Sequence, residues 1–233
     1  MNTNLIFRQL FDYETWTYTY LLADATTKEA VLIDTVKEQV SRDLRILAEL
    51  GLKLKFVLET HVHADHITGA SDLREKTGAR VGVSAAAGIS CADLPLKEND
   101  TIPFGEFRLK VLATTGHTNT CLSYYMDGMV FTGDALFIRD VGRTDFQQGS
   151  NEKMYENISQ KLFSLPEATK VYPGHDYKGE LHSTIAEEKA HNIKLGGGKS
   201  LKEFSKLMQE MKLGPPKKIH IAVPANLQCG KIS

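Results

Sequence analysis

The chain has 233 residues, 42% of them hydrophobic, and its 28 basic side chains nearly balance its 29 acidic ones. This balance gives no electrostatic reason to expect nucleic acid or a membrane surface as a partner, so we expect a small molecule instead. The length suits a single domain over residues 1–233, with a short C-terminal extension of helix and loop at about 180–233.

The cellular location is predicted from what the sequence lacks. No apolar run approaches the roughly 20 residues of a membrane-spanning helix, and the N-terminal segment resembles neither a signal peptide nor a transit peptide. The chain has three cysteines, an odd number, and they are widely spaced: Cys91, Cys121 and Cys229. We therefore expect no disulfide framework, no cysteine-based zinc site and a reducing compartment, the cytoplasm.

Apolar periodicity predicts an alternation of strands and helices along the chain. Expected strands are LIFRQLFD, TYTYLLAD, EAVLIDT, KFVLET, ARVGVS, FRLKVLATT, a hairpin over 121–134, and ATKVYPGHD. Helices are expected at 36–50, up to Lys76, at 151–164, and from the capping box of Ser200 and Glu203 to about Leu213. This α/β pattern indicates layered sheets flanked by helices, with a site in a cleft at one edge.

The clearest chemical motif is His61-Val-His63-Ala-Asp65-His66, at the end of a predicted strand. Two histidines two positions apart in an extended chain face the same way, and the acid and third histidine continue around the turn. Such a cluster predicts a metal site rather than isolated surface histidines. Three further candidates each follow a glycine, which permits a tight turn at a strand end. They are His117, Asp134 and His175.

The motifs THVHADH, GHT, TGDALF and YPGHD resemble those of the metallo-β-lactamase superfamily, which includes two-metal hydrolases and one-metal oxygenases. Within it, the chain is most similar to the persulfide dioxygenases through THVHADHITGA, GRTDFQQGS, YPGHDYKG and AVPANLQCG. The resemblance covers about Phe7 to Gly230. It implies an αββα sandwich, in which two mixed β-sheets are flanked by helices.

The resemblance also implies one Fe(II) per chain, held by His61, His117 and Asp134. A set of two histidines and one carboxylate leaves coordination positions open for a sulfur anion and for O2. The implied reaction oxidises glutathione persulfide with O2 and water to sulfite and glutathione, and a homodimer is a further expectation. The other candidates would orient ligands, handle protons or hold a second metal. They are His63, Asp65, His66 and His175.

By the same resemblance, the glutathione contacts map onto Arg143, Tyr177 and Lys194. The chain departs from the family pattern here, because Lys194 stands where an arginine is expected and replaces a planar two-point contact with a single flexible charge. Structural alternatives stay open for the other two residues. Arg143 would pair with Asp145 or Asp140, and Tyr177 would be a packing aromatic.

The main rival function is a hydroxyacylglutathione hydrolase of the glyoxalase-II type. In it, two metals bridged by Asp134 would generate a hydroxide that attacks a glutathione thioester. GRTDFQQG, AVPAN and the short C-terminal segment favour the dioxygenase. A catalytically silent metal-binding module is disfavoured by the intact ligand set.

Overall fold

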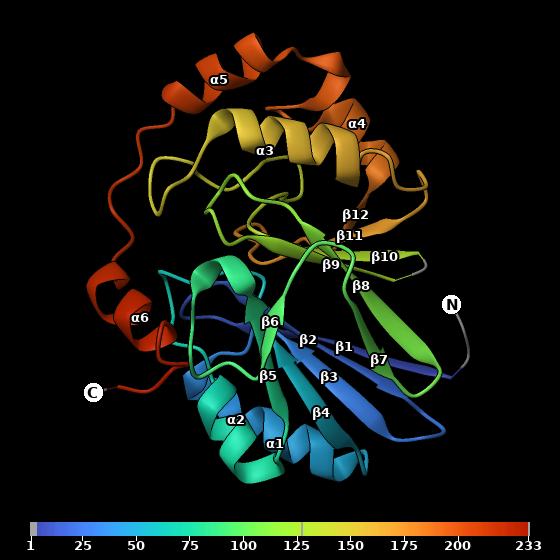
Figure 1. The fold of residues 1–233 in the computed structure, drawn as a ribbon. Coiled ribbons are helices and arrows are strands. Elements are labelled where there is room, and N and C mark those ends of the chain that lie inside the picture. Colours follow the sequence, from blue (N-terminus) through green and yellow to red (C-terminus); the bar gives the residue numbers. More distant parts are fainter. Residues whose placement is uncertain (1–3, 127, 233) are drawn as a thin grey trace.

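In the computed structural model, which describes residues 4–126 and 128–232, two six-stranded sheets face each other and carry helices on their outer sides (Figure 1). The first sheet runs in the order β1-β2-β3-β4-β5-β6, antiparallel up to β3 and parallel beyond it. Its strands are β1 Leu5–Asp12, β2 Thr17–Asp24, β3 Glu29–Ile33, β4 Lys53–Leu58, β5 Arg80–Ser84 and β6 Leu94–Leu96. Helices α1 (Val40–Glu49) and α2 (Ala70–Thr77) lie outside it.

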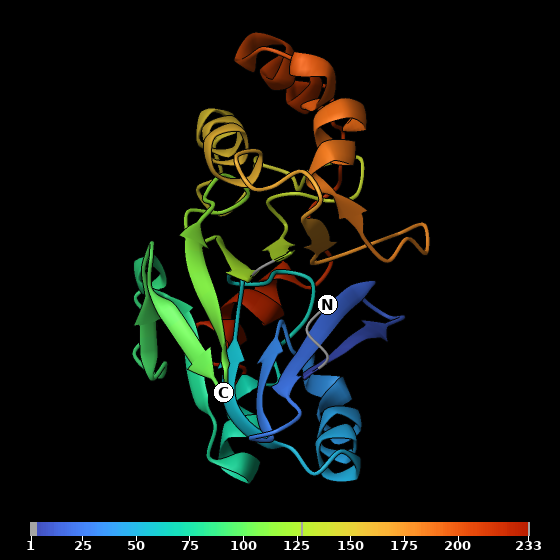
Figure 2. The ribbon, with the colours of Figure 1, turned by 90° about the vertical axis from the view of Figure 1, so that its right-hand side faces the viewer.

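The second sheet has the order β12-β11-β10-β9-β8-β7 and is antiparallel except where β10 pairs with β11. Its strands are β7 Thr101–Phe104, β8 Phe107–Ala113, β9 Leu122–Met126, β10 Met129–Gly133, β11 Lys170–Pro173 and β12 Ser183–Thr184. Helices α3 (Asn151–Asn157), α4 (Ile185–His191) and α5 (Leu201–Gln209) lie on its outer side, as Figure 2 shows from a second direction. The αββα sandwich predicted from the sequence is confirmed.

The core between the sheets is rich in aromatic side chains that also tie the two sheets together near one edge. Tyr20 packs against Phe131, with ring centroids 4.9 Å apart, and both are buried. The hydroxyl of Tyr20 donates to the carbonyl of Pro173 at 2.6 Å. Tyr124 likewise donates to the carbonyl of Glu59 at 2.7 Å. Because a buried hydroxyl needs a partner, these bonds fix the ends of β11 and β4, the strands that precede His175 and His61.

Most of the expected elements form with small shifts at their ends. The helix expected at 36–50 forms as a short turn, η1 (Lys37–Gln39), followed by α1. The one expected at 151–164 forms as α3 continued by η3 (Ile158–Leu162). Ser200 and Glu203 make the predicted capping box, but α5 ends at Gln209 rather than near Leu213. The expected hairpin forms between β9 and β10, although Asp127 in its turn lies outside the described residues.

Several short elements were missed because their signals are weak. Strands β6, β7 and β12 are two to four residues long. Helix α6 (Ile219–Asn226) contains Pro224 and has no marked polar face, so neither propensity nor periodicity indicates a helix. Helix α4 was also missed, although its signal was not weak: it begins with a capping box of Thr184 and Glu187 that can be read from the sequence.

The expectation that the cysteines are unpaired is wrong for two of them. Cys91 and Cys229 form a disulfide with Cα atoms 6.2 Å apart, although 138 positions separate them in sequence. The fold brings the loop before β6 against the segment after α6, and spacing along the chain carries no information about such a meeting. Cys121 is a buried free thiol.

Within residues 4–126 and 128–232, no helix has the length and apolar character that crossing a membrane requires.

Candidate metal centre

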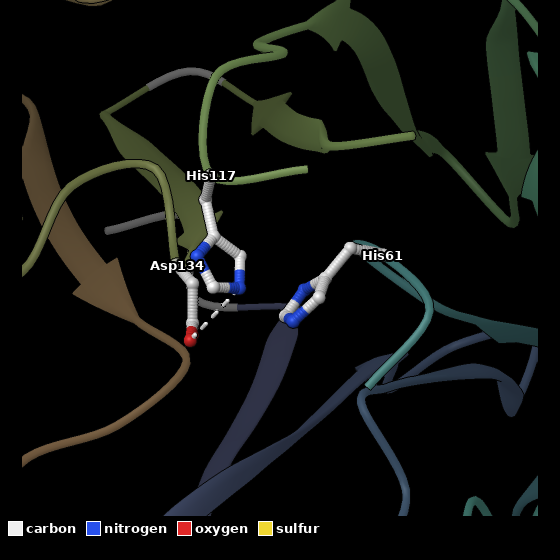
Figure 3. Close-up of side chains that lie close together, drawn as sticks. All are labelled: His61, His117 and Asp134. Carbon is white, nitrogen blue, oxygen red and sulfur yellow. Dashed lines mark ion pairs between the residues drawn. The ribbon is translucent and has the colours of Figure 1, made fainter. Parts of the chain in front are cut away.

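Three candidate ligands converge from three separate strand ends. His61 follows β4, His117 follows β8 and Asp134 directly follows β10. Figure 3 shows their side chains pointing toward one another, with His117 Nε2 lying 3.6 Å from Asp134 Oδ2. One ligand atom from each of the three lies within 4.8 Å of the others, a spacing that one metal ion can span.

Close approach of the strand ends depends on glycines beside the ligands. Gly133 has φ +51°, and a Cβ there would clash with the side chain of Thr60. A Cβ on Gly174 would lie 2.6 Å from Asp134 Oδ1. The predicted tight turn is therefore seen at Gly133, whereas Gly174 permits only the close approach of Asp134.

Hydrogen bonds set which ring nitrogen each histidine offers. The hydroxyl of Thr60 donates to Asp34 Oδ2 at 2.9 Å, so it accepts from His61 Nδ1 at 3.0 Å. The backbone carbonyl of Arg143 accepts from His117 Nδ1 at 2.6 Å. Both hydrogen bonds engage Nδ1 and leave Nε2 as the ring nitrogen that is available to a ligand, as expected when a neighbouring acceptor orients the imidazole.

The surroundings of Asp134 indicate that a cation fits this centre. Its Oδ2 faces His117 Nε2, and its Oδ1 lies 3.5 Å from His175 Nε2. Oδ1 is buried without a hydrogen-bond partner among the described residues. An unsatisfied buried carboxylate oxygen is costly, and a bound cation would remove that cost. The donor set and its geometry therefore fit a metal ion.

His63 is held by carboxylates on the side away from these ligands. Its Nε2 lies 3.1 Å from Asp34 Oδ1 and 3.3 Å from Glu59 Oε2, and all three groups are buried. Burial favours a neutral His63, but the two carboxylates outweigh it and raise the pKa of His63 well above its usual value. Burial, and then the charge of His63, lower the pKa of His61 well below its usual value, which leaves His61 neutral and able to bind a metal.

Asp65 lies at the centre of a second group. Its Oδ2 is 2.8 Å from His66 Nδ1 and 3.6 Å from His175 Nε2. Burial favours the neutral carboxyl of Asp65, but the charges of His66 and His175 outweigh it and lower its pKa well below the usual range. Potential ligand atoms of His63, Asp65 and His66 also lie within 4.8 Å of one another. A second metal at these residues therefore stays a prediction.

Arg143 is already engaged within the protein. Its Nε and Nη2 donate to the two carboxylate oxygens of Asp145 at 2.7 and 2.8 Å, and its Nη1 donates to the carbonyl of Gly214 at 2.7 Å. The guanidinium also stacks 4.3 Å over the ring of Phe146. Of the readings left open for Arg143, the structure shows the ion pair with Asp145.

The other two predicted substrate contacts lie nearer the surface. Tyr177 is 62% exposed, and its ring stacks on that of His175 with centroids 6.1 Å apart. This places an open aromatic face beside the candidate ligands. Lys194 is half-buried, and its backbone N–H donates to Asn192 Oδ1 at 3.0 Å.

Two residues that position the HVHADH loop (residues 61–66) were not identified from the sequence. Asn226 Nδ2 donates to the carbonyls of His63 and His66, at 2.9 Å each. Gln147 Nε2 donates to the carbonyl of Val62 at 2.8 Å. Asn226 lies in AVPAN and Gln147 in GRTDFQQG, the motifs on which the resemblance to persulfide dioxygenases rests. The sequence therefore marked both segments, but it did not indicate that these side chains bond to the loop.

Comparisons with known proteins agree with the fold. The sequence model of the metallo-beta-lactamase superfamily matches residues 17–175. The mitochondrial persulfide dioxygenase ETHE1 of Mus musculus is 46% identical, over 97% of this chain and 89% of that protein. Its Homo sapiens counterpart is 44% identical with the same coverage. The crystal structure of ETHE1 from Myxococcus xanthus superposes with a TM-score of 0.94 at 52% identity, covering 97% of this chain and 100% of that one. This chain belongs to the persulfide dioxygenases of the metallo-β-lactamase superfamily.

Proposed function

We propose that this persulfide dioxygenase holds one Fe(II) per chain through His61, His117 and Asp134 and acts on glutathione persulfide. The overall reaction consumes one O2 and one water and yields sulfite, glutathione and two protons. The reaction class, persulfide oxidation, follows from membership of the family. The identity of the metal, its ligands and the thiol carrier are what we propose.

One observation carries the choice of iron: two imidazoles and one carboxyl side chain, each from a different strand end, converge with their ligand atoms within 4.8 Å. Such a set is typical of non-haem Fe(II) oxygenases, because it binds one side of the ion and leaves positions for substrate and O2. Iron would supply the redox chemistry that activates O2, which zinc lacks.

The surrounding histidines and acids would control charge and protons. Burial favours the neutral form of His175, but Asp134 and then Asp65 outweigh it and raise its pKa. His175 Nε2 lies 3.5 Å from Asp134 Oδ1 and 3.6 Å from Asp65 Oδ2. At this position the imidazole would take up or release a proton when an anionic persulfide enters.

For the thiol carrier, we propose that the exposed ring of Tyr177 forms one wall of the binding cleft and that Lys194 provides a single cationic contact to a carboxylate. Arg143 would act mainly through its ion pair with Asp145, which shapes the loop after Asp134. A cytoplasmic location and a homodimer stay predictions.

The test is oxygen uptake by anaerobically iron-loaded protein given glutathione persulfide, with iron content measured on the same sample. About one iron per chain, rapid uptake and stoichiometric sulfite are expected. A glutathione thioester is tested in parallel, because its cleavage by protein holding two metals, without oxygen uptake, would establish the glyoxalase-II-type hydrolase instead.

Variants test the ligand set directly. Asp134→Ala is expected to lose iron retention and oxygen uptake together. Asp72→Ala is the matched control, because Asp72 lies on α2 in an ion pair with Lys37 and is expected to leave both unchanged. An Asp134→Ala protein with full uptake would refute the assignment.

A further inference from the structure

The C-terminal end of the chain closes over the HVHADH loop. After α5, the chain crosses from the layer outside the second sheet to α6, which lies beside the first sheet (Figure 1). Beyond α6, the carbonyl of Cys229 accepts from the N–H of Ser71 at 3.0 Å, and the disulfide joins Cys229 to Cys91. The segment 226–230 is therefore attached both to α2 and to the loop before β6.

Asn226, the last residue of α6, is the point where this segment meets the HVHADH loop. Its Nδ2 donates both of its protons, to the carbonyls of His63 and His66 at 2.9 Å each. Its Oδ1 accepts from the N–H of Thr68 at 2.9 Å. The side chain is only 5% exposed, so water does not replace these bonds readily.

These bonds matter because the loop has no regular secondary structure of its own to fix it. Residues 61–66 belong to no helix or strand, so their carbonyls depend on side chains for partners. One amide holds the carbonyls of two residues on either side of Asp65, as well as the N–H that follows. It thereby fixes the path of the backbone that carries His61, Asp65 and His66.

Apolar packing attaches α6 less strongly than the hydrogen bonds of Asn226 and the disulfide do. Only Ile67, Ala222 and Ala225 form its buried apolar cluster among the described residues. A contact of this size contributes little burial energy. The amide and the disulfide three residues later therefore carry much of the attachment.

We propose that Asn226 is a positioning residue for the metal centre, and that the Cys91–Cys229 disulfide keeps it seated. Asn226 contacts none of the three proposed ligand atoms and acts through the backbone of the HVHADH loop. The inference rests on the metal site proposed above. It predicts that removing the amide weakens metal binding and alters the coordination, beyond any general loss of stability.

The experiment is an anaerobic titration of metal-free protein with Co(II), which reports both the dissociation constant and the visible absorption spectrum of the bound ion. Asn226→Ala is expected to bind Co(II) about 10–100-fold more weakly and to give a changed spectrum, the range found for groups that orient metal ligands. Asn192→Ala is the matched control, because Asn192 is an equally buried amide bonded to Glu188 and the carbonyl of Asp140, outside the HVHADH loop. Asn192→Ala is expected to lower the melting temperature without changing the dissociation constant for Co(II) or the absorption spectrum.

The outcomes separate this inference from the proposed function. If the unmodified protein binds no metal, the proposed function fails. If it binds metal and Asn226→Ala binds equally well with the same spectrum, the positioning role is refuted. Should Asn226→Ala not fold, Cys91→Ser decides, because it keeps the amide and removes only the disulfide. A several-fold weaker affinity supports the inference, and an unchanged affinity overturns it.

Discussion

Loss of the Cys91–Cys229 disulfide should destabilise the protein strongly, because the bridge closes most of the chain into a loop. The two cysteines are 138 positions apart. Cross-linking across such a separation restricts the unfolded chain by about 5 kcal/mol in the chain-entropy model, and native disulfides typically contribute about 2–4 kcal/mol. For a chain of this size each kcal/mol shifts the melting temperature by roughly 2–4 °C. A loss of about 3 kcal/mol therefore corresponds to a decrease of about 6–12 °C.

The assay is thermal unfolding of metal-free protein in excess chelator, with and without a dithiol reductant. The chelator is needed because a bound metal stabilises the folded state on its own. Cys91→Ser without reductant should match the reduced unmodified protein. Cys121→Ser is the control, because Cys121 is a buried free thiol and its variant should still lose stability on reduction.

Two results would refute this reasoning. Coincident melting curves for the oxidised and reduced proteins would show that the bridge does not restrict the unfolded chain. Alkylation of three thiols in unreduced, denatured protein would show that it is absent, whereas one alkylated thiol, that of Cys121, is expected. Burial raises the pKa of Cys121 to about 12, so this thiol should also resist alkylation in the folded protein at neutral pH.

Other predictions concern the strand end and the substrate. Gly133→Ala should lower the free energy of unfolding by about 2–4 kcal/mol in urea titrations, because it adds a clash with Thr60 to the cost of a positive φ. Gly51→Ala has a similar φ of +63° and open space around its Cβ. It should cost only about 1 kcal/mol, and equal losses in the two variants would contradict the role of close approach. Lys194→Arg should lower KM for glutathione persulfide several-fold with little change in kcat, since a guanidinium makes a two-point contact with a carboxylate. An unchanged KM would exclude Lys194 from substrate recognition.

Local sequence was sufficient to predict the elements that deliver the candidate ligands. The HVHADH motif follows a short apolar strand, and Asp134 follows another, so their positions at strand ends depend only on nearby residues. The start of α5 was equally clear, because the capping box of Ser200 and Glu203 is a pattern of four consecutive positions. The end of α5 was not, because the point where a helix stops depends on what it packs against.

Periodicity and residue chemistry over short stretches of the sequence indicated layered sheets flanked by helices and a set of ligand-type residues, and the resemblance of the motifs to a known superfamily implied the αββα sandwich. Only the tertiary structure decided which distant groups meet. It paired Cys91 with Cys229 and placed Asn226 against the loop that carries His63. A hydrogen bond or a disulfide across more than a hundred positions depends on how whole layers pack, and no local pattern encodes that packing.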